Sequence, residues 1–225
     1  ESVLNSDYND FEVIVVDDGS TDDSYKLASE RFKDEPRVRI LRKANGGKSR
    51  ALNLALEKAK GGVFIAIDAD TLFDKNAIRL MVRYFADPNV AAGSGNVKVG
   101  NRGKMITEWQ HTEYVTGFNL ERRAYSELNC ITVVPGAIGA WRRDLVLERG
   151  GFDTDTLAED TDMTLSLLEQ GWRIAFEENA KAYTETPETF RSLLKQRFRW
   201  TYGTLQCLWK HRPAMFSTKQ KPRGS

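Results

Sequence analysis

The sequence predicts an α/β fold in which helices flank a mainly parallel central sheet. In the first third of the chain, short apolar segments alternate with amphipathic ones, as is typical of parallel strands joined by helices. The expected order is strand 11–16, helix 22–32, strand 38–41, helix 48–60 and strand 63–67. The chain opens on what looks like the end of a helix with no strand before it, so we expect that the first strand of the sheet is missing here.

The remaining elements follow from the same periodicities. We expect helices at 76–85, 102–128, 144–149, 159–170 and 189–210, and strands at 90–99, 131–134, 137–141, 174–176 and 180–183. No repeat, low-complexity tract or linker interrupts the 225 residues. Because this length is enough for one domain with its own core, we predict a single domain over 1–225.

The composition is that of an ordinary globular protein. Forty per cent of the residues are apolar, 29% are charged and the formal net charge is +1, so no global charge favours a nucleic-acid partner. The longest apolar stretch, 131–141, is well short of the ~18–20 residues of a membrane-spanning helix, and we expect the chain itself to be soluble. An amphipathic helix over 189–212 mixes aromatic and basic residues, so it either lies at a membrane interface or faces solvent.

Two carboxylates directly follow the most apolar of the expected strands. Asp68 and Asp70 follow the run 63–67, and side chains two apart on a strand share a face. Like charges this close repel each other unless a cation lies between them, and Mg²⁺ or Mn²⁺ prefers such oxygen ligands. The pair is therefore a candidate metal site at the carboxyl edge of the sheet, with a solvated turn as the alternative.

A second acidic pair, Asp17-Asp18, closes the first expected strand and precedes Gly19-Ser20. Carboxylates at this position can accept hydrogen bonds from a ribose hydroxyl or from a base N–H. An Asp-Gly turn followed by a helix cap explains the same residues equally well.

Gly46-Gly47-Lys48 precedes an expected helix. Glycines let the backbone approach a ligand, a helix start favours anions, and Lys48 and Arg50 add positive charge. The spacing of a P-loop is absent, and a plain turn is the alternative.

Glu159-Asp160 begins the expected helix over 159–170. An ionised Asp160 could accept a proton from an attacking hydroxyl, which makes it a candidate general base. Adjacent acids at a helix N-terminus are also stabilised by the helix dipole, so capping is the alternative.

Gln196, Arg199 and Trp200 share one face of the last helix because they are three and four residues apart. Arginine can bind a diphosphate through two donors, tryptophan offers a flat surface for a sugar ring, and glutamine offers amide hydrogen bonds. The alternative is an amphipathic helix whose tryptophan packs in the core.

Together and in this order, these motifs resemble the family 2 glycosyltransferases of the GT-A (Rossmann-like) fold. The likeness extends over almost the whole chain and is greatest to the processive synthases of poly-N-acetylglucosamine, chitin, hyaluronan and cellulose, with the poly-N-acetylglucosamine type nearest. The segments that carry it are Val15–Ser20, Gly46–Asn53, Asp68–Asp70, Glu159-Asp160 and Gln196–Trp200, the last of which matches the Q-x-x-R-W signature of processive members.

The resemblance assigns roles to these residues. It implies that Asp17 and Asp18 hold the uridine of a UDP-sugar, with Lys48 and Arg50 nearby, and that Asp68 and Asp70 bind its diphosphate through Mg²⁺ or Mn²⁺. It makes Glu159 and Asp160 catalytic, with Asp160 as the base. The residues implied at the acceptor and the diphosphate are Gln196, Arg199, Trp200 and Gly136.

The same resemblance implies an inverting transfer of a sugar from a UDP-sugar to a growing β-linked polysaccharide, and it favours N-acetylglucosamine as that sugar. The resemblance also implies a location at the cytoplasmic face of the bacterial cell membrane, reached through flanking segments that we expect to lie outside this chain. Two alternatives stay open: a nucleotide-sugar-binding fragment without turnover, and a non-processive transferase that acts on a lipid or a small acceptor.

Overall fold

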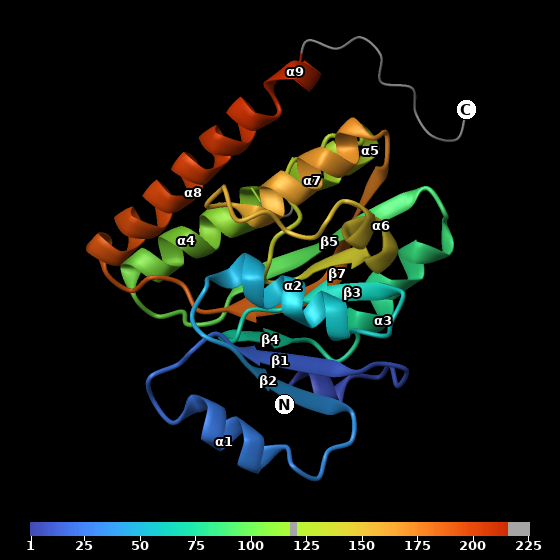
Figure 1. Ribbon diagram of the computed structural model, residues 1–225. Helices are drawn as coiled ribbons and strands as arrows, with labels where there is room; N and C mark the ends of the chain where they lie inside the picture. The colour runs from blue at the N-terminus through green and yellow to red at the C-terminus, as the bar shows by residue number, and fades with distance from the viewer. Residues whose placement is uncertain (118–120, 216–225) are drawn as a thin grey trace.

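The computed structural model describes residues 1–117 and 121–215 and contains two sheets (Figure 1). In the smaller sheet, β1 (Val13–Asp17) and β2 (Val38–Arg42) pair in parallel. The strands of the larger sheet, in spatial order, are β3 (Val63–Ala66), β6 (Gly139–Arg142), β5 (Val90–Val99), β7 (Arg173–Thr184) and β4 (Thr71–Phe73).

Helices surround the larger sheet, and α8 runs along one edge of the molecule (Figure 1). The α-helices are α1 (Ser24–Arg31), α2 (Lys48–Lys58), α3 (Ala77–Val82), α4 (Met105–Val115), α5 (Glu121–Glu127), α6 (Arg143–Glu148), α7 (Glu159–Glu169), α8 (Phe190–Lys210) and α9 (Arg212–Met215). Two short 3₁₀ helices, η1 (Val3–Asn5) and η2 (Arg83–Ala86), complete the described elements. Thr189 caps α8 by accepting a hydrogen bond from the Ser192 amide.

The α/β class is confirmed, but the expectation of mainly parallel pairing is wrong for the larger sheet. Of its four pairings, only β5 with β7 is parallel, and the other three are antiparallel. The connection from β3 to β4 is too short for the crossover of about a dozen residues that parallel neighbours need. β4 instead pairs antiparallel with β7, at the other end of the strand order from β3.

Several element boundaries also differ from the sequence prediction. The helix expected over 102–128 forms two helices, α4 and α5, and residues 118–120 between them lie outside the described part. Segment 131–134 is buried at Ile131 and Val134 without being a strand. The strands expected at 174–176 and 180–183 join into β7, whose pairing with β5 shifts register between them.

Two hydrophobic clusters enclose the larger sheet. Ala140 and Trp141 are neighbours on β6 but belong to different clusters, as expected for side chains on opposite faces of a strand. One cluster includes side chains of α3 together with Tyr114 of α4. The other includes side chains of α2, α6 and α7. Both faces of the sheet are therefore covered, and the free space for a ligand lies at its edge.

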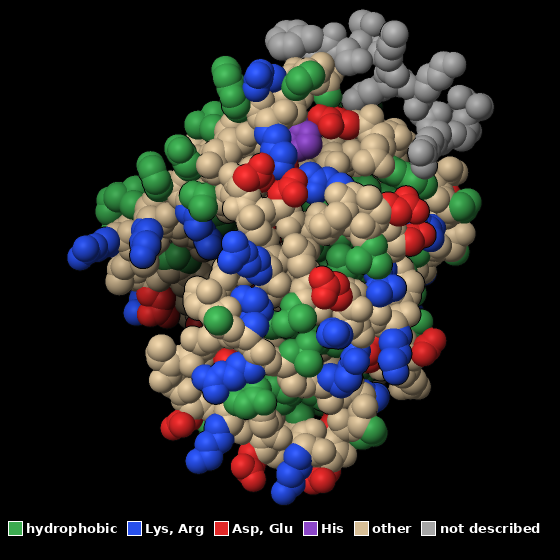
Figure 2. Space-filling model, viewed as in Figure 1, with side chains coloured by type: hydrophobic (Ala, Val, Ile, Leu, Met, Phe, Trp, Pro, Cys, Tyr) green, Lys and Arg blue, Asp and Glu red, His purple; other side chains and the backbone are tan. Residues whose placement is uncertain are grey.

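The outer face of α8 is apolar and unpartnered within the described residues. Figure 2 shows green side chains along this helix at the upper left, interspersed with Lys and Arg. Phe198 is 70% exposed and Trp209 71% exposed, and on α4 Met105 is 88% exposed. The large exposed apolar residues of α8 are Phe190, Leu194, Phe198, Tyr202, Leu205, Leu208 and Trp209.

Candidate active site

A cleft of about 530 Å³ lies beyond the carboxyl end of β3, between α2, α7 and α8. It brings together most of the site residues that the sequence predicts, from positions more than a hundred residues apart. The predicted residues that line it are Lys48, Asp68, Asp70, Gly136, Glu159, Asp160, Gln196, Arg199 and Trp200. The large sheet thus ends at one shared pocket, where ligands bind in open α/β sheets.

Asp68 and Asp70 lie in the loop after β3 because that strand ends at Ala66. The Asp68 Oδ1 atom is 2.5 Å from Lys48 Nζ, and the Asp70 Oδ1 atom accepts a hydrogen bond of 3.2 Å from Thr184 Oγ1 of β7. Both carboxylates face the cleft and carry only oxygen donors, so their chemistry fits a hard divalent cation.

Lys48 links the acidic loop to the start of α7. Its ammonium group also lies 3.5 Å from the Glu159 carboxylate. Burial lowers the pKa of Lys48, but the attraction of Asp68 and Glu159 outweighs it and the net pKa is raised. The amine therefore stays charged, as an anion-binding role requires.

Gly136 lies directly beside the end of the Lys48 side chain. A Cβ atom there would lie only 2.5 Å from Lys48 Nζ. The Gly136 amide also donates a hydrogen bond of 3.2 Å to Asp160 Oδ2. Residue 136 thus lets the ammonium group and the carboxylate approach the same short stretch of backbone.

Asp160 lies in the first turn of α7, where the helix dipole stabilises its negative charge. Its Oδ1 atom accepts a 2.7 Å hydrogen bond from the Thr161 amide. For neighbouring Glu159, burial raises the pKa first, the charge of Asp160 adds to this, and Lys48 partly offsets it. The two acids therefore differ: Glu159 is partly buried beside Lys48, and Asp160 accepts hydrogen bonds from backbone amides.

The cleft face of α8 carries the three residues of the Q-x-x-R-W motif. Trp200 packs against the hydrophobic cluster of α3 and α4, and the Arg197 guanidinium lies 4.5 Å above its ring. The same Arg197 pairs with Glu113 of α4 at 2.6 Å. Gln196 Oε1 is buried and has no hydrogen-bond partner within residues 1–117 and 121–215, so a polar acceptor atom is available at the cleft.

Asp17, Asp18 and Arg50 lie outside the described lining of the cleft. Asp18 accepts hydrogen bonds from the Gly46 and Gly47 amides at 3.0 and 2.8 Å. Burial opposes ionisation of Asp18, but hydrogen bonds from Lys43 and these amides lower its pKa. Asp18 thereby holds the glycine turn that does line the cleft.

Asp17 and Arg50 come from the elements on which that turn packs or into which it leads, β1 and α2. Asp17 is buried at the end of β1, and its Oδ2 atom is 3.1 Å from Arg42 Nε. Arg50 is exposed on α2, and its Cδ would lie 2.9 Å from a Cβ at position 46. In this conformation, the carboxylate of Asp17 forms an ion pair with Arg42 and does not line the cleft.

Sequence reasoning missed several residues of the cleft lining, including two with shifted pKa values. Tyr114 and Arg122 line the pocket from α4 and α5. Burial raises the pKa of Tyr114 to about 12, and burial lowers that of Arg122 to about 10, with partial compensation by Asp160. Neither residue belongs to a motif, and only the fold brings them to the cleft.

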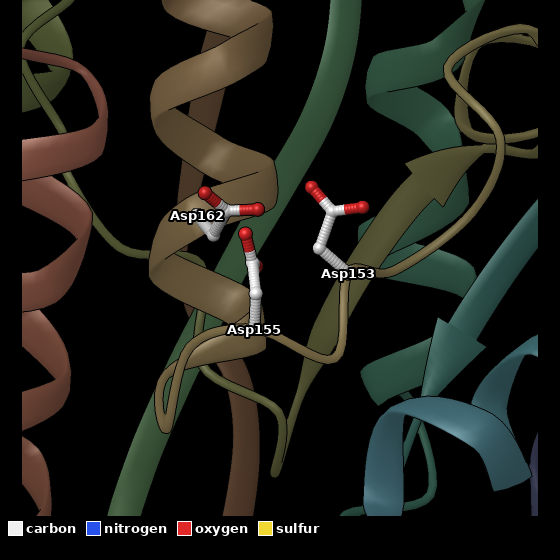
Figure 3. A group of neighbouring side chains, drawn as sticks. All are labelled: Asp153, Asp155 and Asp162. Atoms are coloured by element: carbon white, nitrogen blue, oxygen red, sulfur yellow. The ribbon is translucent and has the colours of Figure 1, made fainter.

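A separate acidic group, Asp153, Asp155 and Asp162, was also missed (Figure 3). One carboxylate oxygen from each lies within 4.8 Å of the others. Lys210 Nζ, however, is 2.6 Å from Asp153, 3.0 Å from Asp155 and 3.2 Å from Asp162. Lys210 and Arg149 supply two positive charges to these three carboxylates, so ion pairs already hold the group together.

Comparison with known families decides the assignment. Residues 1–203 match the family described as "Glycosyltransferase like family 2". The chain belongs to this family. It is therefore a glycosyltransferase, and the cleft with its acidic residues is its candidate active site.

Curated relatives include two poly-beta-1,6-N-acetyl-D-glucosamine synthases. The one from Staphylococcus aureus (strain COL) is 28% identical over 222 residues, which cover 98% of this chain and 54% of the relative. The one from Staphylococcus epidermidis is 28% identical over 220 residues, which cover 97% of this chain and 53% of the relative. The chain thus spans about half the length of these relatives.

Among solved structures, the chain is similar to a mannosyltransferase from Pyrobaculum calidifontis in complex with GDP-Man and Mn²⁺. The TM-score is 0.78 at 25% sequence identity, and the match covers 94% of this chain and 58% of the other. This likeness confirms the GT-A fold that the sequence motifs imply.

Within residues 1–117 and 121–215, no helix combines the length and the apolar character needed to cross a membrane.

Proposed function

We propose that this chain catalyses an inverting transfer of N-acetylglucosamine from a UDP-sugar to a growing β-linked polysaccharide. The observation that carries the proposal is the single cleft shared by Asp70, Asp160 and the Q-x-x-R-W face of α8. A transferase needs a donor site, a base and an acceptor surface within a few ångströms of one reacting carbon. This cleft has candidates for all three, and the named synthases among its relatives support the choice of sugar.

On the donor side, Asp68 and Asp70 would hold Mg²⁺ or Mn²⁺. The Mn²⁺ bound by the similar mannosyltransferase supports this, as does the oxygen-only donor set. When bound, the ion supplies positive charge that balances the diphosphate of the leaving group. Lys48 and Arg199 add positive charge at the same cleft and would stabilise the UDP that departs.

For the nucleoside we propose the acidic motif after β1. Asp18 holds the Gly46-Gly47 turn through two amides, and Arg50 is close to Gly46. Asp17 and Asp18 would contact the uridine at the side of the cleft where this turn lies. Accepting hydrogen bonds from the ligand would require Asp17 to loosen its ion pair with Arg42.

Asp160 is proposed as the general base. The acceptor hydroxyl gives its proton to this carboxylate while its oxygen forms the new bond to the anomeric carbon. The bond from that carbon to the diphosphate oxygen breaks, and UDP leaves with the electron pair. Attack on the face opposite the leaving group converts an α-linked donor into a β-linked product. Glu159 would set the charge around Asp160 and Lys48.

The acceptor end of the glycan would bind over α8. Trp200 offers a flat ring, the Gln196 Oε1 atom is available as an acceptor of hydrogen bonds, and Gly136 leaves room beside Asp160. A surface that holds the chain end between transfers favours a processive enzyme.

We also propose that the protein works at the cytoplasmic face of a bacterial membrane, with the outer face of α8 at the interface. The support is the row of exposed apolar side chains with basic neighbours on this helix (Figure 2). Flotation with anionic liposomes tests this: binding that is lost in Phe198→Ser/Trp209→Ser supports it, and the absence of binding to any vesicle contradicts it.

The decisive experiment for the function is a product assay with the complete protein that contains this chain. We expect Mn²⁺-dependent release of UDP from UDP-N-acetylglucosamine and a β-linked polymer. Other labelled UDP-sugars serve as controls for donor choice. A product with a single added sugar would support a non-processive transferase instead, and UDP-sugar binding without UDP release would support a binding module.

A further inference from the structure

One face of α8 continues from the cleft to the far end of the helix. Gln196, Arg199 and Trp200 line the cleft from its first half. Three and four residues further on, the same face packs against the segment 157–162, which carries Asp160. The contact residues of this second half are Gly203, Gln206, Cys207, Lys210 and His211.

The contact is close at its centre. A Cβ atom at Gly203 would lie 2.9 Å from Ala158 Cβ and 3.0 Å from the Ala158 amide nitrogen, so only glycine fits there. Gln206 Oε1 accepts a 3.0 Å hydrogen bond from the Leu157 amide. The thiol of Cys207, which is fully buried, lies 3.5 Å from the Ala158 carbonyl oxygen. The backbone just before Asp160 is therefore held directly by α8.

The contact ends in an ion-pair cluster around Asp162, whose side chain is fully buried. Lys210 Nζ lies 3.2 Å from Asp162 Oδ2, and His211 Nε2 lies 2.8 Å from Asp162 Oδ1. Arg149, from the C-terminus of α6, lies 2.8 Å from Asp162 and 3.0 Å from Asp153. Asp162 thus joins α6, α7 and α8 at one point.

Asp162 cannot itself face the cleft when Asp160 does. Residues two apart on an α-helix point about 200° from each other around the axis. The cleft lining includes Asp160 and Thr161 and, within the described residues, leaves out Asp162. Any effect of Asp162 on the reaction must therefore act through the position of α7 and α8.

We infer that Asp162 and Lys210 are positioning residues, which fix the spacing between the base Asp160 on α7 and the Q-x-x-R-W residues on α8. This rests on the proposed function of the cleft. Breaking the pair frees the end of α8, so the base and the acceptor surface lose their mutual alignment. The donor residues Asp68 and Asp70, on the loop after β3, keep theirs.

The test compares Lys210→Met with Lys210→Arg and with Lys195→Met, an exposed position on the same helix. We expect Lys210→Met to lower kcat for UDP-N-acetylglucosamine by about 10- to 100-fold, because small misplacements of reacting groups are costly. The Kd for UDP with Mn²⁺ should stay within about twofold, and Lys210→Arg should restore most of kcat. Lys195→Met should behave as the unchanged protein.

A second measurement separates this inference from the proposed function. Hydrogen exchange at the Leu157 and Asp162 amides, which bond to Gln206 and to Ala158, should quicken in Lys210→Met and in Asp162→Asn while the β5 amides stay protected. If the unchanged protein transfers no sugar, the proposed function fails. The exchange rates then still show whether Lys210 and Asp162 hold α8 against segment 157–162. Unchanged exchange at 157–162, or a normal kcat in a folded Lys210→Met protein, would overturn the inference.

Discussion

At the scale of single residues, the cleft depends on how closely charged groups can approach the backbone. Gly136 shows this most directly, because a Cβ atom there would lie 2.5 Å from Lys48 Nζ and 3.9 Å from Asp160 Oδ2. Lys48 in turn lies between Asp68 and Glu159. A methyl group at position 136 would therefore displace the Lys48 ammonium group, whereas its distance to Asp160 is that of an ordinary contact.

The Gly136→Ala substitution tests this. We expect the rate of sugar transfer to fall about 10- to 100-fold, because the Lys48 ammonium group must move away from its position in the cleft. Gly62→Ala is the matched control, since a Cβ atom there meets nothing within 4 Å. Steady-state kinetics of both variants measure the effect, and equal rates for the two would show that the close approach is not needed.

A second residue-scale prediction concerns the metal. Asp70→Ala removes a carboxylate that accepts hydrogen bonds from the hydroxyl groups of Thr71 and Thr184. We expect Mn²⁺-dependent UDP binding to weaken by at least about 10-fold, while binding without metal stays the same. Isothermal titration calorimetry with and without Mn²⁺ measures both. Identical Mn²⁺-dependent affinities in the two proteins would contradict the assignment.

At the residue scale, most of the site residues that the motifs predicted line the cleft. Asp70, Asp160 and Arg199 share it as expected. Tyr114 and Arg122 could not be predicted, because neither belongs to a motif and the fold alone brings them to the cleft. The ion pairs of Asp162 were missed for another reason. Its partners, Lys210 and Arg149, are charged residues in separate helical segments, and nothing in the sequence indicates that they meet.

At the scale of elements, α8 combines three surfaces. Its first half faces the cleft, its second half packs on 157–162, and its outer face is apolar and exposed. The sequence predicted this helix well because its apolar and polar residues recur at helical spacing and Thr189 caps it. The short strand β4 was not predicted at all, and the direction of β6 could not be predicted because hydrophobic patterns identify strands but not their partners.

The closeness of α8 to Ala158 yields an element-scale prediction. Gly203→Val should lower the free energy of unfolding by about 1–3 kcal/mol, because the added atoms have no room beside Ala158. Thr201→Val, at an exposed position of the same helix, is the control and should change it far less. Urea unfolding followed by circular dichroism measures both, and equal midpoints would show that α8 is not tightly seated there.

At the scale of the whole molecule, two covered faces leave the sheet edge as the place for chemistry. Segments from the first, middle and last parts of the chain meet there. For this reason no single motif was enough to predict the site, whereas the motifs together were. The α/β class followed from the alternation of strands and helices, whereas the mixed pairing of the larger sheet depended on connection lengths and on contacts between distant segments.

Metal removal is the prediction that belongs to this scale. Chelation with EDTA should abolish transfer while the fold, followed by circular dichroism, stays intact, because the core does not depend on Asp68 or Asp70. Adding Mn²⁺ or Mg²⁺ back should restore the rate. Full activity in excess EDTA would contradict a metal-dependent donor site.

The most direct test of the central claim is Asp160→Asn in the complete protein. The claim is that Asp160 is the base of a cleft that binds UDP-sugar by other residues. We predict that turnover with UDP-N-acetylglucosamine falls by about 10³-fold, while the Kd for UDP with Mn²⁺ stays within about twofold. Near-normal turnover in this variant, or a loss of UDP binding as large as the loss of turnover, would contradict it.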